Sequence, residues 1–344
     1  MQVSVIIPVY NAADFICTAV ESALAEPETA EVILVEDNSS DDSLHVCETL
    51  AREYDLVRLY RHPDGGNHGA GASRNLGIRM SRFPYIAFLD ADDFYLPDRF
   101  TAAQEILTSN PDIDGVYEAI GTHYDNDSLR DRWRASEQYR GLKGDLTTMT
   151  TVVEPEDLFG ALVGGSVGNF SGDGLVVRRT LFEKTGLFDE QLRLHQDTAM
   201  WIKMAAVGRL APGRLDNPVA MRRVHASNRI LSPRSASERH KTRMLMWDTL
   251  LKWSRHNLNT TRKRILIDAY TKQTILPFRN DPSITGRVKA LLSLAALAMK
   301  HRVLLTSYYF WKQYVLRMLR YFGLGKIIAL LVKLRRWLIE IKMV

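Results

Sequence analysis

Short apolar runs alternate with amphipathic segments over residues 1–120 of the chain. The run Val3–Val9 is apolar except for Ser4, which is typical of a strand buried on both faces. Other segments repeat apolar residues every three or four positions, which is helical spacing. The pattern predicts strands at 3–9, 32–35, 56–60 and 85–89, and helices at 14–25, 41–54 and 72–80. Because strands and helices alternate, we expect an α/β fold with a mostly parallel sheet and right-handed crossovers.

The remaining two thirds of the chain divide into two regions. Residues 122–150 are polar and irregular, and we interpret them as an insertion or a flexible loop. The pattern then predicts strands at 175–177 and 218–224 and helices at 180–185 and 198–207. From about Ser237 onward it is helical to the end. We therefore predict a first domain over residues 1–235 and a helical region over 236–344.

Three polar loops follow strands of the predicted sheet. They are Pro8–Asn11, Glu36–Asp42 and Asp90–Asp93. The carboxyl ends of parallel strands meet at one edge of a sheet, and ligands bind beyond that edge. The agreement between the three loops predicts a binding site there.

The sharpest chemical signal is the acidic run that follows Phe88-Leu89. Asp90, Asp92 and Asp93 place three carboxylates within four residues, directly after an apolar strand. Like charges this close repel and raise one another's pKa. A hard divalent cation relieves the repulsion and keeps coordination positions for a phosphate. The alternative is a solvated acidic turn with a helix cap before Pro97.

The net charge of +5 is unevenly distributed. Residues 300–344 carry ten Lys or Arg and one acid, Glu340, which is a net +9. Residues 1–299 then hold 35 basic and 39 acidic residues, a net −4. An acidic main body argues against a nucleic-acid partner. The two cysteines, Cys17 and Cys47, lack metal-site spacing, and we interpret them as core thiols in a reducing cytosol.

The basic tail has an amphipathic pattern. Segments 302–322 and 326–342 place apolar residues, including Trp311 and Trp337, along one side, with Lys and Arg beside them. Such helices lie in a membrane interface, whereas no run approaches the roughly 18 apolar residues of a membrane span. The chain starts directly on a strand, without a signal-peptide pattern. We expect a cytoplasmic protein held peripherally on an anionic membrane surface. The alternative for this region is an oligomerisation surface or a helical cap.

Five motifs resemble, in order and spacing, the inverting nucleotide-sugar glycosyltransferases of family 2. The similarity covers roughly residues 1–230. The motifs are VSVIIPVYNAADFICTAVESAL, VILVEDNSSDDS, GAGASRNLGI, YIAFLDADD and GLFDEQLRLHQDTAMWIKM. The resemblance implies a GT-A fold, which is a Rossmann-like, mostly parallel sheet. It also implies a nucleotide-sugar donor and a divalent metal, manganese or magnesium.

The resemblance also implies a donor-binding set. Pro8, Val9 and Tyr10 would form the wall around the nucleoside, and Asp37 would hydrogen-bond the base, typically uracil. Arg74 would contact base or phosphate. The alternative for Asp37 is a turn former before Asn38, and for Arg74 a solvated helix residue. A dinucleotide-binding GxGxxG motif is excluded because Arg74 stands at its third glycine position.

The resemblance further implies residues that bind the metal and a residue that accepts the proton of the acceptor hydroxyl. In the Asp90-Ala91-Asp92 segment the first carboxylate would face the ribose and the second the metal, and His225 matches a position that contacts metal or diphosphate. Asp197 resembles the general base, and Gln196 precedes it where many family members carry a second Glu or Asp. The structural alternatives are a helix cap at Asp197 and a packing role for His225. Independently, three arginines could contact phosphate: Arg222, Arg223 and Arg229.

These inferences predict a metal-dependent inverting hexosyltransferase. It would move a sugar from a nucleotide-sugar, with UDP as the expected nucleotide, to a hydroxyl of a cell-envelope glycan, lipopolysaccharide or lipid-linked acceptor. A homo-oligomer is compatible with the sequence. One alternative is a sugar-phosphate nucleotidyltransferase, but this expects a Gly-rich, basic signature after the first strand, where Pro8-Val9-Tyr10 stands. The other is a membrane-bound scaffold with a decayed transferase domain.

Overall fold

The computed structural model describes most of the chain. The described residues are 1–136, 139, 144–165, 167–228, 235–278, 281, 283–301, 304–305, 310–312, 314–315 and 318. They form two compact units, Met1–Thr249 and Leu250–Val344. The predicted boundary at 235/236 lies just before the helix that crosses from one unit to the other, and it stays a prediction.

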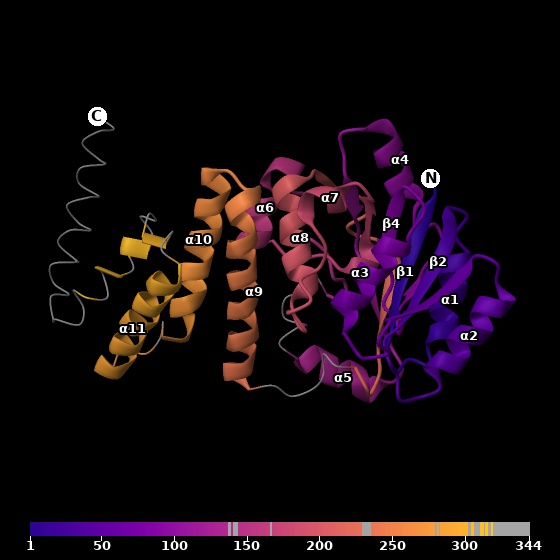
Figure 1. Ribbon diagram of the computed structural model, residues 1–344, viewed down its shortest axis with the longest axis horizontal. Coiled ribbons are helices and arrows are strands. Elements are labelled where there is room, and N and C mark those ends of the chain that lie inside the picture. The colour runs from indigo at the N-terminus through magenta and orange to yellow at the C-terminus, as the bar shows by residue number, and fades with distance from the viewer. Residues whose placement is uncertain are drawn as a thin grey trace. The chain divides into compact units, whose positions relative to one another are not determined.

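A seven-stranded sheet forms the centre of the first unit (Figure 1). Its order is β3-β2-β1-β4-β8-β6-β9, and only the two pairings of β8 are antiparallel. This confirms the α/β fold with a mostly parallel sheet. The strands are β1 Val3–Val9, β2 Thr29–Glu36, β3 Val57–Arg61, β4 Tyr85–Phe88, β6 Gly115–Tyr117, β8 Leu175–Arg178 and β9 Leu210–Pro212.

Helices cover both faces of this sheet. On one face, α1 (Ile16–Leu24) and α2 (Ser43–Glu53) pack against the odd-numbered residues of β1. On the other face, α3 (Ala70–Met80) approaches β1 so closely that a Cβ at Gly77 would lie 2.4 Å from Cγ2 of Ile6. The chain winds outward through β2 and β3 and returns through α3 to β4. The point where strand order reverses, between β1 and β4, is where such sheets bind ligands.

A small second sheet brings distant segments together beside that point. Its order is β5-β10-β7, with bounds Phe94–Tyr95, Ala220–Val224 and Gly121–Tyr124. β5 directly follows Asp90–Asp93, the acidic turn, and β10 directly precedes His225. Antiparallel pairing of Met221 with Phe94 therefore brings His225 next to the acidic turn.

The interpretation of 122–150 as an irregular insertion is wrong for its first part. β7 and helix α5 (Asp127–Ala135) occupy it, and α5 is held by Trp133, which is fully buried and clusters with Leu129 and Val224. Trp133 and Leu129 stand four positions apart among charged residues, so the apolar side of the helix is too narrow to dominate the pattern. The other helical segments of the first unit are α4 Thr101–Ser109, α6 Pro155–Gly164, η2 Gly172–Gly174, α7 Leu181–Thr185 and α8 Gln196–Val207.

The second unit is helical in its described part. α9 (Ala236–Asn257) begins in the first unit and ends in the second. It is followed by α10 Thr260–Ile275, η4 Leu276–Phe278 and α11 Ile284–Lys300. Asn259 and Ser283 cap α10 and α11 by accepting backbone N–H bonds, which stabilises the helix starts. Among the described residues, we find no helix long and apolar enough to span a bilayer.

Two sequence expectations have mixed outcomes. Cys47 is buried as expected, but Cys17 is exposed, so only one of the two thiols belongs to the core. Most of the predicted amphipathic helix 302–322, and all of 326–342, lie outside the described residues.

Candidate active site at the carboxyl edge of the sheet

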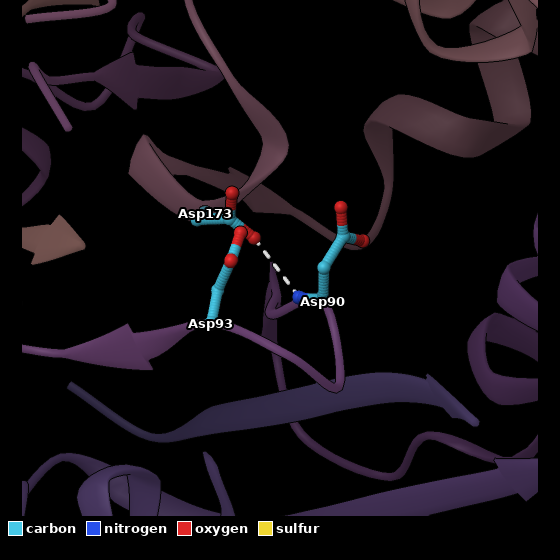
Figure 2. A group of neighbouring side chains, drawn as sticks. All are labelled: Asp90, Asp93 and Asp173. Atoms are coloured by element: carbon cyan, nitrogen blue, oxygen red, sulfur yellow. Dashed lines mark hydrogen bonds between the residues drawn. The ribbon is translucent and has the colours of Figure 1, made fainter. Parts of the chain in front are cut away.

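The backbone of the acidic turn after β4 is hydrogen-bonded to the carboxylate of Asp173, a residue that the sequence analysis did not single out. The backbone N–H of Asp90 donates to Oδ1 of Asp173, 2.9 Å away (Figure 2). Asp173 lies in η2, is 1% exposed, and accepts a second bond from the Ser171 hydroxyl. No apolar strand precedes Asp173 directly, so its segment carried no signal beyond being rich in glycine.

Asp90, Asp93 and Asp173 can bring one oxygen each to within 4.8 Å of one another. Burial raises the pKa of Asp93 well above its usual range, and the neighbouring Asp173, Asp92 and Asp90 carboxylates add to this shift. Loss of hydration also raises the pKa of Asp90. The turn therefore concentrates negative charge that a cation would stabilise.

The structure brings together two of the predicted metal ligands, Asp92 and His225. Nε2 of His225 lies 3.0 Å from Oδ2 of Asp92, and the Asn228 amide donates to the same oxygen across 3.1 Å. The Asp92 side chain is 32% exposed and the His225 side chain 9%. Nδ1 of His225 is paired with the Ser227 hydroxyl at 2.8 Å, which orients the ring. A carboxylate and an imidazole on an open face fit a divalent cation such as Mn²⁺.

Arg74 is buried beside the acidic turn. Its Nη2 donates to Oδ1 of Asp90 across 2.5 Å, and its Nη1 donates to Oε1 of Gln196 across 3.4 Å. The guanidinium also lies over the rings of Phe88 and Phe188. Both terminal nitrogens thus have protein partners, and the predicted contact of Arg74 with base or phosphate stays a prediction.

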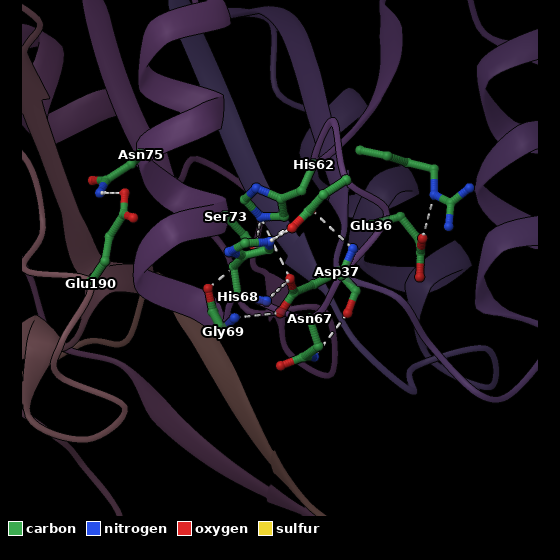
Figure 3. A network of polar contacts seen from close by, with 12 residues as sticks. Glu36, Asp37, His62, Asn67, His68, Gly69, Ser73, Asn75 and Glu190 are labelled. Carbon is green, nitrogen blue, oxygen red and sulfur yellow. Dashed lines mark hydrogen bonds and ion pairs between the residues drawn. The ribbon is translucent and has the colours of Figure 1, made fainter.

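Asp37 holds a loop in place. Its two carboxylate oxygens accept the backbone N–H groups of His68 and Gly69, each at 2.7 Å (Figure 3). The Asn67 side chain donates to the Asp37 carbonyl, and Gly69 has φ +85°, a value that favours glycine. The Gly-rich loop before α3 is therefore built on the predicted base-binding residue, which is 2% exposed.

The same loop is tied to the segment before α8. Arg193 donates from both terminal nitrogens to Asn67, to its side-chain and backbone oxygens, at 3.1 Å each. His62, which directly follows β3, lies with its ring centroid 4.4 Å from that of His68 in this loop. Burial lowers the pKa of His62, and the neighbouring His68 lowers it further.

The predicted nucleoside wall lies at the end of β1. Pro8 and Val9 pair with Val35 and Glu36 of β2, and Val9 is fully buried. Tyr10, just beyond the strand, is 53% exposed. Ala91, in the acidic turn, is buried. Only Tyr10 of this group therefore offers a large accessible face for a base to stack on.

Asp197 lies in the first turn of α8 and is not its cap. The N-cap position is His195, with φ 62°, and the helix begins at Gln196. The Asp197 carboxylate is half-buried and accepts the N–H of Thr198 at 2.6 Å. The Asp197 carboxylate therefore lies in the first turn of the helix, where the helix dipole interacts favourably with an acidic side chain.

The arginines of β10 have different roles in the fold. Arg222 donates to Thr147 and Ser171, and Ser171 in turn contacts Asp173. The Arg223 guanidinium lies over the rings of Phe15 and Phe94, and its backbone N–H donates to Asp93. Arg229 lies outside the described residues.

Comparison with known proteins decides the family. Residues 4–185, more than half of the chain, match the model "Glycosyl transferase family 2". The chain belongs to glycosyltransferase family 2. Among family relatives, the uncharacterized glycosyltransferase RP339 of Rickettsia prowazekii is 28% identical over 89% of this chain and 87% of its own length. The succinoglycan biosynthesis protein ExoU of Rhizobium meliloti is 33% identical over 60% of this chain and 58% of its own length.

Solved structures agree on the fold. TarS 1–349 of S. aureus, crystallised with UDP-GlcNAc, matches with a TM-score of 0.58. The match covers 86% of this chain and 80% of TarS 1–349, at 17% identity. This likeness confirms the expected fold of this family 2 glycosyltransferase and says nothing by itself about its donor.

Proposed function

We propose that this family 2 glycosyltransferase is a metal-dependent inverting enzyme that transfers a sugar from a UDP-linked donor. The acceptor would be a hydroxyl of a cell-envelope glycan, lipopolysaccharide or lipid-linked glycan. The observation that carries the proposal is the contact of Asp92, in the acidic turn, with His225, at the edge where such sheets bind ligands. Family membership favours glycosyl transfer over the nucleotidyltransferase and scaffold alternatives.

One relative in sequence and two structural neighbours support the details. ExoU is named for succinoglycan biosynthesis, which favours a polysaccharide acceptor. TarS was crystallised with UDP-GlcNAc, which favours uridine. A mannosyltransferase of Pyrobaculum calidifontis, solved with GDP-Man and Mn²⁺, has a TM-score of 0.50, with 93% of this chain and 84% of the other covered at 17% identity. It favours a manganese-dependent mechanism.

The proposed mechanism assigns the charge of the leaving diphosphate and the proton of the acceptor hydroxyl to different residues. Asp92 and His225, with Asp90 in the same turn, would hold the divalent cation, which as a Lewis acid stabilises the negative charge of the departing diphosphate. Arg222 donates to Ser171, which in turn donates to Asp173 beside the acidic turn. From this position its guanidinium can contact a phosphate oxygen. Of the predicted nucleoside wall Pro8, Val9 and Tyr10, the exposed Tyr10 would contact the nucleoside.

Asp197 would move the proton. Inversion requires a base on the face of the sugar opposite the leaving group, and one Asp197 oxygen would accept the proton of the attacking hydroxyl. A positioned base contributes about 10²- to 10⁴-fold. Asp197 suits this role because its carboxylate contacts Thr198 and it is not one of the residues assigned to the cation.

A donor screen tests the proposal. The purified full chain is heated with MnCl₂ and UDP-, GDP- or TDP-linked sugars, and its melting temperature is measured. A bound ligand stabilises by mass action, so UDP-sugars should raise the melting temperature, and only with the metal. A larger shift with GDP-sugars would overturn the uridine assignment, and no shift with any donor would overturn the nucleotide-sugar assignment.

The proposal also places the enzyme peripherally on a membrane. Ten of the last 45 residues are Lys or Arg, which favours an anionic surface where a lipid-linked acceptor would lie.

A further inference from the structure

The two units of the chain carry opposite charges. Residues 1–249 contain 26 Lys or Arg and 37 Asp or Glu, a net −11. Residues 250–344 contain 19 Lys or Arg and three acids, a net +16. The change of sign coincides with the structural division, so the positive charge belongs to the whole second unit rather than to the terminal tail alone.

The second unit also exposes large apolar side chains. On α11, Leu292 is 63% exposed and Met299 is 79% exposed. They are seven positions apart, with Ala295 between them, and therefore lie on one face of the helix. Trp311 and Val315 are 45% and 47% exposed. Scattered apolar residues are normal on a surface, but a group around one groove marks an interaction site.

A groove of about 560 Å³ lies among these residues. Of the residues that the structure describes there, the lining side chains are apolar except for the Tyr314 hydroxyl: Ala295, Ala298, Met299, Leu305, Phe310, Trp311 and Tyr314. The Trp311 indole N–H donates to the Leu305 carbonyl at 2.7 Å, so the one polar atom of that ring is already paired. The groove therefore offers an apolar wall, and its volume is that of a small-molecule site.

We propose that the apolar face formed by Leu292, Met299, Leu305, Trp311 and Val315 inserts into the surface of an anionic bilayer. A hydrocarbon chain of that bilayer occupies the groove. Charge complementarity favours this partner, because a unit of net +16 is attracted to anionic headgroups. Basic amphipathic surfaces that carry Trp and Tyr lie at the boundary between the headgroups and the acyl chains. The inference deepens the membrane part of the proposed function and does not depend on the transfer reaction.

Vesicle flotation of the full chain tests the inference. Vesicles of phosphatidylglycerol and phosphatidylcholine are compared with vesicles of phosphatidylcholine alone, at low and high salt. Binding should require phosphatidylglycerol and weaken as salt screens the charges. The double variant Leu292→Ser/Met299→Ser should bind at least tenfold more weakly at constant net charge.

The matched control is Asn257→Ser/Thr261→Ser, which changes two exposed polar residues of the same unit and should bind as the unaltered chain does. Equal binding by the two double variants would overturn the inference. So would self-association that the Leu292→Ser/Met299→Ser variant loses while its vesicle binding is unchanged, because the face would then belong to a second copy.

A second readout does not rely on that variant. Brominated phosphatidylglycerol should quench part of the tryptophan emission, and Trp311→Phe should remove part of that quenching. Quenching that is unchanged in Trp311→Phe would overturn the inference. Donor binding measured without vesicles keeps the two proposals apart: a chain that binds UDP-sugar but no vesicles contradicts only this inference.

Discussion

Arg74 on α3 donates to the carboxylate of Asp90 across 2.5 Å and lies over the rings of Phe88 and Phe188. Its other terminal nitrogen donates to Gln196, the residue before Asp197. One buried guanidinium thus joins the acidic turn to the start of α8, which are 106 positions apart from Asp90 to Gln196. We infer that Arg74 positions the two halves of the proposed site.

Replacing Arg74 should therefore impair transfer. Arg74→Gln should lower kcat/KM about 10- to 100-fold, because a hydrogen bond to a charged group contributes about 1.5–3 kcal/mol. Arg74→Lys keeps the charge but loses the two-pronged contact, and should fall between. The control is Arg79→Lys, an exposed residue of the same helix. Unchanged kinetics in Arg74→Gln would remove Arg74 from the site.

Asp197→Asn should separate binding from chemistry. The substitution keeps the shape of the side chain but removes its ability to accept a proton, so we expect kcat to fall by about 10²- to 10⁴-fold. The Kd for the donor, measured by calorimetry, should stay within twofold. Asp112→Asn, an exposed acid of the same unit, serves as the control. Normal turnover in Asp197→Asn would exclude it as the base.

Metal dependence should follow Asp92 and His225. EDTA should stop transfer, and MnCl₂ or MgCl₂ should restore it. In Asp92→Asn the metal concentration that gives half of the maximal activity should rise at least tenfold, because the substitution removes a charged ligand. Full activity in EDTA would contradict the role of the acidic turn. Equal metal dependence in Asp92→Asn and in the unaltered chain would show that Asp92 is not a ligand of the metal.

A pair of glycine substitutions tests the packing of α3. In Gly77→Ala the new methyl group would meet Ile6, and overpacking costs about 1–3 kcal/mol, so the melting temperature should fall. Gly160 lies in α6 with open space around it, and Gly160→Ala should stabilise the helix by up to about 1 kcal/mol. Equal shifts in the two variants would contradict the close approach of α3 to β1.

Local patterns predicted the strands and helices of the first 89 residues because most of these elements have a clear strand or helix pattern, whereas the two-residue strand β5 was not predicted. β1 is apolar except for Ser4, and the acidic turn Asp90–Asp93 begins two residues after the end of β4. The contact of His225 with Asp92 was expected only from the resemblance, since it depends on pairing β10 with β5 across 126 positions from Phe94 to Ala220. Such non-local pairing leaves no periodic signal in either segment.

Asp173 and α5 were missed for different reasons. Asp173 acts through its burial and its bond to the Asp90 backbone, and neither can be read from a Gly-rich segment. α5 carries mostly charged residues, so its buried Trp133 and Leu129 did not stand out. The function of an acidic residue depends on the groups that surround it, and these are known only from the folded structure.

The most direct test of the account is a crystal of the chain soaked with UDP and MnCl₂, with data collected at a wavelength where manganese scatters anomalously. We expect a manganese peak within bonding distance of both Asp92 and His225, with the diphosphate on its open side. A nucleotide bound elsewhere, or no peak at the end of β4 at saturating concentrations, would contradict the account.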